Sequence, residues 1–390
     1  TLESVATIAV GALPDMLTFT PDGTRLIVAN EGEPSDDGTI DPVGSVSIID
    51  VRDPRRPTVR TAEFDPFNGR AAELRARGVR LAGAGVSVAQ DVEPEYVAVA
   101  PDGRTAWVTL QENNALAVVD IATAVVTDVL PLGEQDHARD GHGFDASDRD
   151  GVVRIRPWPV RSLFQPDAIG SWVADGVTYL VHANEGDTRA WGGREELVRV
   201  GTLPLDTSVF SRDVCGGPCT NETQLGRLHV FADRGRNALT GRFDTLVMSG
   251  TRSFSIRHTD GRLVWDSGDA IEQRTAQLDG VPFNGDDDTQ PFDVRSDDRG
   301  PEPEGLVLGN VGGRTVVFVA LERTGGVMAW DVTVPSAPTF ITYVNTLATH
   351  GDRSPEGLAF IPADRSPNGQ PLLMVGFEVS GTTVVFQVVR

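Results

Sequence analysis

Acidic side chains recur at two fixed places in a phrase that the sequence repeats, and they are the residues that could do chemistry. In each copy, Pro and an acid open a strand-like stretch, and a later apolar stretch ends in Glu; the first copy runs from Pro14-Asp15 to Glu31. The acids at the first place are Asp15, Glu95, Asp167, Glu304 and Glu356. The acids at the second place are Glu31, Glu112, Glu185, Glu322 and Glu378. Carboxylates that meet in space repel one another, so such a set has to bind a cation, pair with Arg or take up protons.

The chemistry that these residues favour is the binding of a divalent cation. Carboxylate oxygens without thiolates suit Ca²⁺ or Mg²⁺, and we expect Ca²⁺. The predicted metal ligands within the repeats are Asp15, Glu31, Glu95, Glu112, Asp167, Glu185, Glu304, Glu322 and Glu356. The additional predicted ligand-binding residues are Asn30, Asn113 and Asn184, which could add carbonyl ligands, and Arg189 and Arg323, which could act as internal counter-charges. The alternative is that acids at strand ends only fix turns or latch neighbouring sheets together.

Two further acidic runs lie outside the repeated phrase. In the run Asp145–Gly151, closely spaced carboxylates precede a Gly, which is what a tight cation-binding turn needs, so Asp145, Asp148 and Asp150 are predicted as metal ligands. The run lacks the full EF-hand spacing and its closing Glu. Gly285-Asp286-Asp287-Asp288 is a weaker candidate of the same kind. The alternative for both runs is a solvated loop.

The elements that must position these acids are short strands, with almost no helix between them. Several strand-like stretches meet at Asp-Gly, as at Asp22-Gly23 and Asp102-Gly103, and this dipeptide favours tight hairpin turns. Five copies of a strand–turn–strand unit predict an all-β fold, a β-propeller of four-stranded blades. Because the innermost strand of each blade lines the central channel, the acids of all copies are expected to share one mouth.

The blade count is predicted as seven, with six or eight as alternatives. A sixth unit is expected around Thr240–Ile271 and a seventh between Ile121 and Gln165, while Val5–Val10 is expected to close the ring beside Thr383–Val388. Residues 1–390 are predicted to form one propeller domain with insertions at about 66–90 and 133–160. Within the first insertion, Gly69–Leu81 is typical of a short helix that ends at Gly78.

The charge of the chain restricts its partners. The net charge is −22, from 56 acids against 34 bases, and every base is Arg. Such a surface is a poor partner for nucleic acid or an anionic membrane. No apolar stretch approaches the ~18 residues of a membrane-spanning helix. The expected partners are therefore a divalent cation and a small cationic or phosphorylated ligand, or a component of the cell envelope.

The two cysteines indicate the compartment. Cys215 and Cys219 are separated by a short Gly-Gly-Pro loop that lets them approach to disulfide distance. They lack His neighbours at zinc-ligand spacing. A local disulfide is therefore predicted, and with it an oxidising location, secreted, periplasmic or at the cell surface.

The common catalytic motifs are absent from the sequence and do not indicate a reaction. The six His residues show neither HxH nor HExxH spacing, and the sequence contains no Gly-x-Ser-x-Gly elbow and no P-loop. No nucleophile–base pair can be named from spacing alone.

Long stretches around the repeated acids resemble the choice-of-anchor I family, a group that includes the mesenchyme-specific cell-surface glycoprotein type. They are Asn30–Glu33, Asp91–Tyr96, Leu110–Ala115, Gln165–Ile169, Ala183–Asp187 and Gly300–Gly305. The resemblance covers essentially the whole chain. It implies a secreted or cell-surface bacterial β-propeller, often tethered by a separate C-terminal anchor.

Two classes of function follow. The first is a Ca²⁺-binding extracellular module that binds a ligand or belongs to a surface layer. The second is a metal-dependent phosphoesterase, because the resemblance extends to relatives with alkaline-phosphatase or phytase-like labels. Such an enzyme would use the same acidic mouth to activate water, and in a chain without Lys an Arg would have to hold the phosphate. The first class is preferred, because no catalytic group is identifiable beyond the carboxylates.

Overall fold

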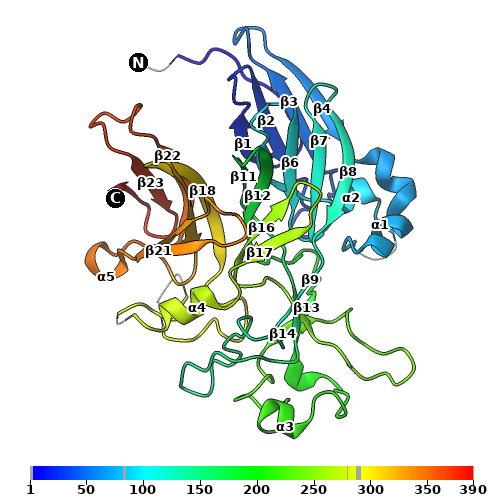
Figure 1. Cartoon of the computed structure of the whole chain (residues 1–390). Coiled ribbons are helices and arrows are strands. Elements are labelled where there is room, and N and C mark those ends of the chain that lie inside the picture. The colour runs from blue at the N-terminus through cyan, green and yellow to red at the C-terminus, as the bar shows by residue number, and fades with distance from the viewer. Residues whose placement is uncertain (1–2, 82–84, 279, 287–290, 390) are drawn as a thin grey trace.

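The computed structural model describes residues 3–81, 85–278, 280–286 and 291–389, and the chain is mostly β (Figure 1). Four antiparallel sheets have four strands each, and a fifth has three. The first sheet contains β1 (Pro14–Phe19), β2 (Arg25–Asn30), β3 (Ser45–Asp50) and β4 (Thr58–Glu63). The second contains β5 (Pro94–Val99), β6 (Thr105–Leu110), β7 (Ala115–Asp120) and β8 (Val125–Pro131).

The remaining three sheets follow the same order, from the strand that carries or directly follows the first acid outward. The third contains β11 (Ile169–Ala174), β12 (Val177–Ala183), β16 (Phe254–His258) and β17 (Leu263–Asp266). The fourth contains β18 (Pro303–Val311), β19 (Arg314–Leu321), β20 (Val327–Asp331) and β21 (Thr339–Val344). The fifth contains β22 (Pro355–Ile361), β23 (Leu372–Phe377) and β24 (Thr382–Gln387).

The hairpins form where the sequence has Asp-Gly. Between β1 and β2, Gly23 has a φ of 68°, a conformation that costs Gly little and other residues more. The Asp22 carboxylate accepts hydrogen bonds from the backbone N–H of Thr24 (3.0 Å) and the hydroxyl of Thr20 (2.6 Å), which fixes the turn. The predicted turn chemistry is confirmed here.

The sheets are arranged like successive blades around one axis. β1 lies beside β5, β5 beside β11, β11 beside β18 and β18 beside β22, so the five innermost strands form a continuous arc. Apolar cores join consecutive sheets: Ile27 and Val108 share one cluster, Trp107 and Leu180 a second, Phe254 and Trp330 a third, and Phe318 and Leu373 a fourth. Face-to-face packing of antiparallel sheets around an axis is the architecture of a β-propeller.

The predicted sixth unit is wrong as a separate blade. Its strands β16 and β17 complete the third sheet. β16 pairs with β12, with Tyr179 opposite His258 at one end and Ala183 opposite Phe254 at the other. The chain leaves that sheet after Ala183 and returns to it some 70 residues later, an excursion that local sequence patterns do not reveal.

The region predicted to hide a seventh unit also pairs differently. It contains β8 and the short strands β9 (Glu134–Asp136) and β10 (Arg161–Leu163), and β10 pairs in parallel with β15 (Val247–Met248). This three-stranded sheet is not a four-stranded antiparallel meander like the blades.

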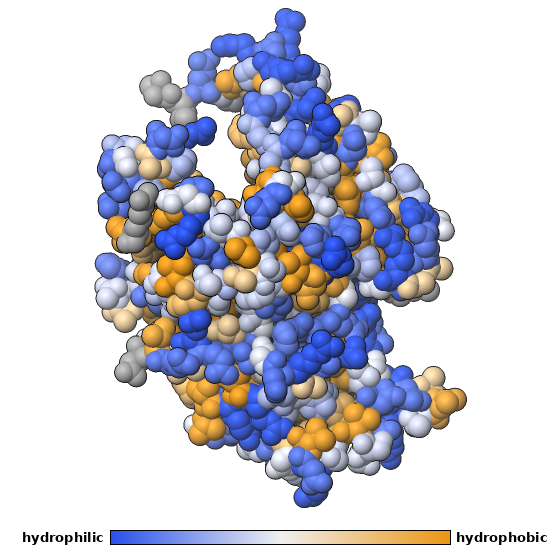
Figure 2. Space-filling view, in the orientation of Figure 1, coloured by the Kyte–Doolittle hydropathy of each residue, from blue (hydrophilic) through white to orange (hydrophobic). Residues whose placement is uncertain are grey.

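The N-terminal segment does not take the place expected of it. Residues 3–10 form no strand in the described structure, and the fifth sheet ends at β24 without a fourth strand. The first and fifth sheets face each other across an open notch in the views of Figures 1 and 2. The side chains of Leu17 and Phe19 on β1 are 61% and 55% exposed there.

A second lobe is built from insertions into the blades. It contains β9, β10, β15, β13 (Leu197–Arg199), β14 (His229–Phe231), η2 (Val200–Thr202) and α3 (Arg212–Cys215). A separate apolar core, which includes Phe144, Trp158 and Val230, holds it together. Cys215 and Cys219 form the predicted disulfide within this lobe. Sequence analysis identified only its first part, residues 133–160.

The other helices are short connectors. η1 (Asp65–Arg70), α1 (Ala71–Arg77) and α2 (Val88–Asp91) join the first two sheets, α4 (Ala270–Thr275) follows the third, and α5 (Leu347–His350) precedes the fifth. The predicted helix end at Gly78 is confirmed, since Gly78 caps α1 with a φ of 108°. In the described part of the chain, none of the helices has the length and apolar character required to cross a membrane.

The core between the third and fourth sheets provides a test of blade packing. Phe254 is fully buried, and its ring centroid lies 5.2 Å from that of Trp265 and 5.4 Å from that of Trp330. We expect Phe254→Ala to lower the free energy of unfolding by about 3–5 kcal/mol, measured by urea denaturation, because it leaves a cavity between two blades. The matched control Phe19→Ala, at an exposed site, should change it by less than about 1 kcal/mol. Equal effects of both changes would contradict the packing described.

Candidate functional site

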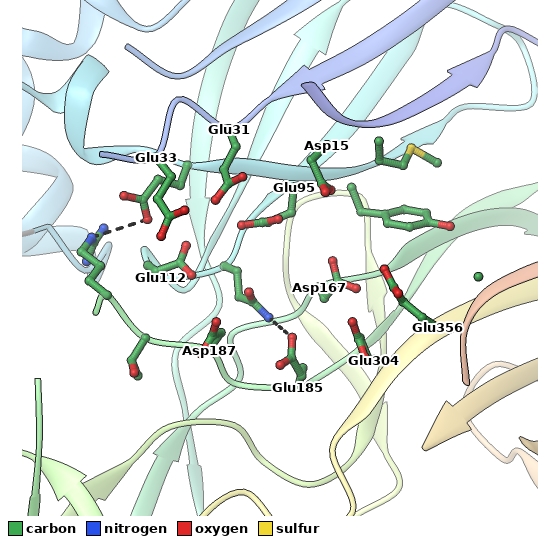
Figure 3. A pocket seen from close by; sticks show the side chains of 18 residues that line it. Asp15, Glu31, Glu33, Glu95, Glu112, Asp167, Glu185, Asp187, Glu304 and Glu356 are labelled. Atoms are coloured by element: carbon green, nitrogen blue, oxygen red, sulfur yellow. Dashed lines mark hydrogen bonds and ion pairs between the residues drawn. The ribbon is translucent and has the colours of Figure 1, made fainter. Parts of the chain in front are cut away.

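A cavity of about 420 Å³ lies where the innermost strands of the five sheets begin (Figure 3). Its lining is acidic to an unusual degree. The eleven carboxylates that line it belong to Asp15, Glu31, Glu33, Glu93, Glu95, Glu112, Asp167, Glu185, Asp187, Glu304 and Glu356. Arg189 is the one basic side chain among the described residues of the lining; Met16, Tyr96, Gln111, Thr188 and two glycines complete it.

A repeated irregularity of the innermost strands places the first acid of each phrase. In β1 the register shifts between Pro14 and Leu17, so the stretch that contains Asp15 has one more residue than the strand opposite it. The same shift occurs around Glu95, Glu304 and Glu356. Such bulges turn a side chain away from the regular alternation of the strand. Four of the five acids at this place therefore share one local geometry.

Strand pairing brings the second acid of each phrase next to the first. Pro14 is opposite Asn30, so Asp15 and Glu31 lie at the same end of the β1–β2 pair. In the second sheet Pro94 is opposite Leu110. Glu112 therefore lies two residues beyond the end of this strand pair, at the end where Glu95 lies. The convergence expected from the repeat is thus a consequence of antiparallel register.

The structure brings together most of the predicted acids. Those that line the cavity are Asp15, Glu31, Glu95, Glu112, Asp167, Glu185, Glu304 and Glu356. Glu322 lies just outside the lining, and one carboxylate oxygen of Glu322, Glu185 and Glu302 falls within 4.8 Å of the others. Glu378 is exposed and does not line the cavity, although its charge acts on Glu356.

Sequence analysis did not select Glu33, Glu93 and Asp187, which also line the cavity. Each stands two residues from a predicted acid: Glu33 follows Glu31, Asp187 follows Glu185, and Glu93 precedes Glu95. In two copies of the phrase, a second acid stands two residues after the strand-end Glu. This repeated spacing was the signal that could have identified Glu33 and Asp187.

Arg189 acts as a counter-charge within the wall of the cavity. Its guanidinium nitrogens lie 3.6 Å from an Asp91 oxygen, 3.7 Å from a Glu93 oxygen and 3.8 Å from a Glu196 oxygen. The side chain is 1% exposed. Arg189 therefore compensates acids on one side of the cavity, although its Nη1 has no hydrogen-bond partner among the described residues.

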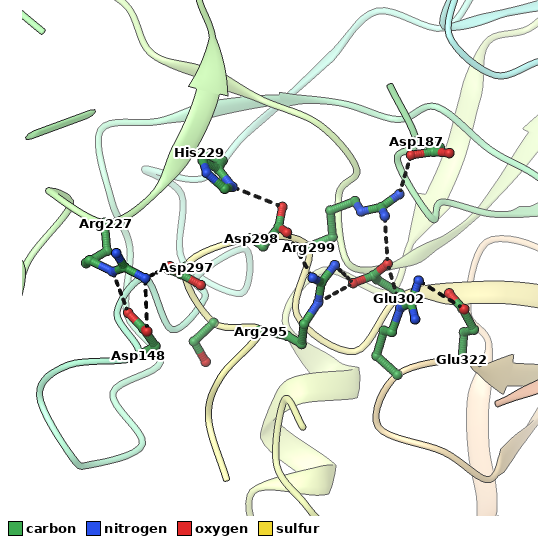
Figure 4. A network of polar contacts seen from close by, with 12 residues as sticks. Asp148, Asp187, Arg227, His229, Arg295, Asp297, Asp298, Arg299, Glu302 and Glu322 are labelled. Atoms are coloured by element: carbon green, nitrogen blue, oxygen red, sulfur yellow. Dashed lines mark hydrogen bonds and ion pairs between the residues drawn. The ribbon is translucent and has the colours of Figure 1, made fainter. Parts of the chain in front are cut away.

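A second group of Arg residues compensates the acids below the cavity (Figure 4). Arg299 Nη1 lies 3.0 Å from both Glu185 Oε1 and Asp187 Oδ1, and its Nη2 lies 3.2 Å from Glu302 Oε2. Arg323 pairs with Glu302 (3.4 Å) and Glu322 (3.2 Å), and Arg295 also pairs with Glu302. The cluster of Glu185, Glu302 and Glu322 is thus already supplied with cationic partners.

The three predicted Asn ligands lie outside the cavity lining and serve as hydrogen-bonding latches. Asn30 Nδ2 donates to Ser47 Oγ (3.0 Å), and Asn184 Nδ2 donates to Ser255 Oγ (2.9 Å) at the equivalent place in the third sheet. Asn113 Nδ2 donates to the backbone oxygens of Arg80 and Asp91. Each amide ties the end of a strand to its neighbours.

The Asp145–Gly151 run lies in the second lobe, away from the cavity. Its carboxylates already have partners: Asp145 accepts the backbone N–H groups of Ser147 and Arg154, Asp148 pairs with Arg227 at 3.0 Å, and Asp150 pairs with Arg154 at 2.9 Å. This arrangement is that of a turn fixed by Arg and backbone donors. In the other acidic run, Asp287 and Asp288 lie outside the described residues.

Burial and mutual repulsion raise the pKa values of the cavity acids. Loss of solvation, followed by the charges of Glu33 and Glu112, raises the pKa of Glu31 to about 8. Loss of solvation also raises the pKa of Glu185 to about 7, although Arg299 acts against it. Loss of solvation is also the main reason why the pKa values of Glu95, Glu112 and Asp167 rise well above the usual range. The cavity therefore favours protons or cations over bare carboxylates.

These shifts predict how stability depends on pH when chelator keeps divalent cations away. The pKa of Glu31 is higher in the folded chain (about 8) than its ordinary value of 4.5. Its stabilising contribution is therefore complete below pH 4.5 and is lost as the pH rises through about 8. We expect Glu31→Gln, which removes this penalty, to have a higher melting temperature than the parent at pH 8.5 and a similar one near pH 5.

Calorimetry at both pH values, with chelator present, measures this difference. Glu63→Gln, at the exposed end of β4, is the matched control and should behave like the parent at each pH. A melting temperature of Glu31→Gln below that of the parent at pH 8.5 would show that the Glu31 charge is not repelled in the folded protein.

Comparison with known proteins identifies relatives. The family model described as "Choice-of-anchor I domain" matches residues 1–335. The mesenchyme-specific cell surface glycoprotein of Strongylocentrotus purpuratus is 31% identical over 273 residues, which cover 62% of this chain and 35% of that protein. Gigasin-3a of Magallana gigas is 32% identical over 190 residues, which cover 43% of this chain and 66% of that protein. The chain thus spans only part of the length of these relatives.

Solved structures with a similar arrangement include the periplasmic gluconolactonase PpgL of Pseudomonas aeruginosa (TM-score 0.39, 15% identity, 98% of this chain and 83% of that one). The Cps50 (Swd1) beta-propeller domain of Myceliophteria thermophila is another (TM-score 0.37, 8% identity, 96% and 84%). The family match takes in four of the five copies of the repeated phrase and all but one of the acids that line the cavity. The chain belongs to the choice-of-anchor I family.

Proposed function

We propose that this protein is an extracellular β-propeller module that binds divalent cations, Ca²⁺ foremost, in its acidic cavity. The observation that carries the proposal is the convergence of eleven carboxylates on one cavity of about 420 Å³ with a single Arg in its lining. Carboxylates of this number require positive charge, and hard oxygen ligands favour Ca²⁺ or Mg²⁺ over softer metals. Ca²⁺ fits the irregular placement of these side chains better, since Mg²⁺ demands near-ideal octahedral geometry.

A bound cation would cross-link the blades. Its ligands come from the innermost strands of the first, second, fourth and fifth sheets, through Asp15, Glu95, Glu304 and Glu356, and from Asp167 just before the third. Asp15 and Glu356 belong to the two ends of the arc and already act on each other electrostatically. We therefore propose that the arc closes into a ring around the cation site. Five sheets contribute to this arc, since the two further units expected from the sequence do not form separate four-stranded sheets.

The alternative of a metal-dependent phosphoesterase receives less support from the cavity. A phosphate needs a cationic group, and in this chain that group has to be Arg. Arg189, the Arg of the lining, is held by Asp91, Glu93 and Glu196. A ligand that presents a positive charge suits the remaining surface of the cavity better than an anionic substrate does.

The proposed location is extracellular or periplasmic. The disulfide between Cys215 and Cys219 is stable in an oxidising compartment, and one relative is named as a cell-surface glycoprotein. Both observations support secretion or display at the cell surface.

Calorimetric titration of chelator-stripped protein with Ca²⁺ at pH 7.5 tests the function. We expect saturable binding and a higher melting temperature, because a ligand that binds only the folded chain stabilises it. Glu95→Gln should weaken binding by at least roughly tenfold, since affinity follows ligand charge. Glu63→Gln is the control and should bind like the parent.

The same samples distinguish the alternative. Hydrolysis of a chromogenic phosphate ester that stops with EDTA would favour the phosphoesterase. Folded protein that binds neither Ca²⁺ nor Mg²⁺ at millimolar concentration would contradict both functions.

A further inference from the structure

We propose that the cavity holds two cations at separate positions, which share the carboxylate of Glu95. This inference rests on the proposed function and adds the number and placement of the ions. It follows from how the eleven acids are distributed within the cavity, which is not uniform (Figure 3).

Two groups of carboxylates occupy opposite sides of the cavity. The first carboxylate group consists of Glu31, Glu33, Glu93 and Glu112. The second consists of Asp15, Asp167, Glu304 and Glu356. Figure 3 shows Glu31, Glu33 and Glu112 together on one side and Asp167, Glu304 and Glu356 on the other.

The larger electrostatic contacts follow the same division, and smaller ones cross it, between Glu31 and Asp15 and between Asp167 and Glu112. The carboxylate of Glu31 interacts with those of Glu33 and Glu112, and that of Glu112 with Glu93. On the other side, Glu304 interacts with Asp167 and Glu356.

Glu95 stands between the groups. Its carboxylate interacts with Glu112 and Glu31 of the first group and with Asp167 and Asp15 of the second. Figure 3 shows it in the middle of the cavity. A carboxylate has two oxygens and about four lone-pair directions, so one side chain in this place can face a cation on each side.

A buried oxygen without a partner in each group points to a missing ligand on each side. Glu112 is 6% exposed, and its Oε2 has no hydrogen-bond partner among the described residues. Glu304 Oε2, in the second group, is likewise buried without a partner there. An unsatisfied buried carboxylate oxygen is costly, more so than a neutral group, unless a ligand meets it. One ion cannot easily serve both atoms, because they belong to opposite sides of the cavity.

Charge balance favours more than one ion. The two groups and Glu95 contribute nine carboxylates, against which the lining offers Arg189. One Ca²⁺ takes 6–8 oxygens and brings two positive charges, so a single ion would leave most of the negative charge unbalanced. Arg189 pairs with Glu93 of the first group, and the second group has no Arg in the described lining. The second position should therefore have the greater need for a cation.

Counting the bound ions tests the inference. Chelator-stripped protein is titrated with Ca²⁺ in a calorimeter, and metal content after dialysis is measured by mass spectrometry. We expect two Ca²⁺ per chain for the parent. Glu304→Gln should retain one, with the second lost or weakened by at least about tenfold, and Glu31→Gln should affect the other ion in the same way. Glu95→Gln should weaken both.

Glu378→Gln is the matched control, because Glu378 occupies the second place of the repeated phrase but lies outside the lining; it should bind two ions. Circular dichroism confirms that each variant is folded. One ion per parent chain, weakened alike by Glu304→Gln and Glu31→Gln, would overturn the inference and leave the proposed function intact. Two ions that are both lost in either single variant would overturn the separate positions. No bound ion in folded parent would overturn the proposed function itself.

Discussion

Repulsion between carboxylates held in one cavity is the constraint on which the rest of this structure depends. Burial removes the water that would screen these charges, and strand register keeps the side chains from moving apart. Most of the positive charge that compensates them lies behind the cavity, and among the described residues of the lining only Arg189 carries one. Arg189 on one side, and Arg295, Arg299 and Arg323 below, each contact carboxylates at the rim or just beyond it.

The acids at the cavity are of two kinds, those with Arg partners and those without such a partner among the described residues. Glu185 and Glu302 face Arg299 and are held as part of the protein's own ion network. Asp167, Glu304 and Glu356 have no such partner in the described lining. The first kind of acid joins the loop after β12 to the segment before β18 through Arg299, and the second kind is the one proposed to meet an outside cation. A buried ion pair that is already satisfied adds little binding capacity.

Much of the site could be predicted because its residues belong to a repeat. In each of these copies the innermost strand has a bulge directly after its Pro, and a Glu follows the end of the strand paired with it. The acids of one copy therefore predict the positions of the acids in the others. The Asn residues at the neighbouring position lie outside the cavity lining, because a strand-end amide can face either the axis or the next strand, and only packing decides. The second lobe could not be predicted beyond its start, since β16 pairs with a strand about 70 residues earlier in the chain.

The sequence by itself determined the β class, the turns at Asp-Gly, the local disulfide and most of the acids that meet, because each depends on neighbouring residues or on periodic repetition. Tertiary structure alone decided which acids have Arg partners, since Arg299 and Glu185 are 114 residues apart. It also decided that Asp148 belongs to an ion pair with Arg227 and that the fifth sheet has three strands. Long-range pairing carries no local signature, because the cost of closing a chain loop depends only weakly on its length and leaves many partners open to each residue.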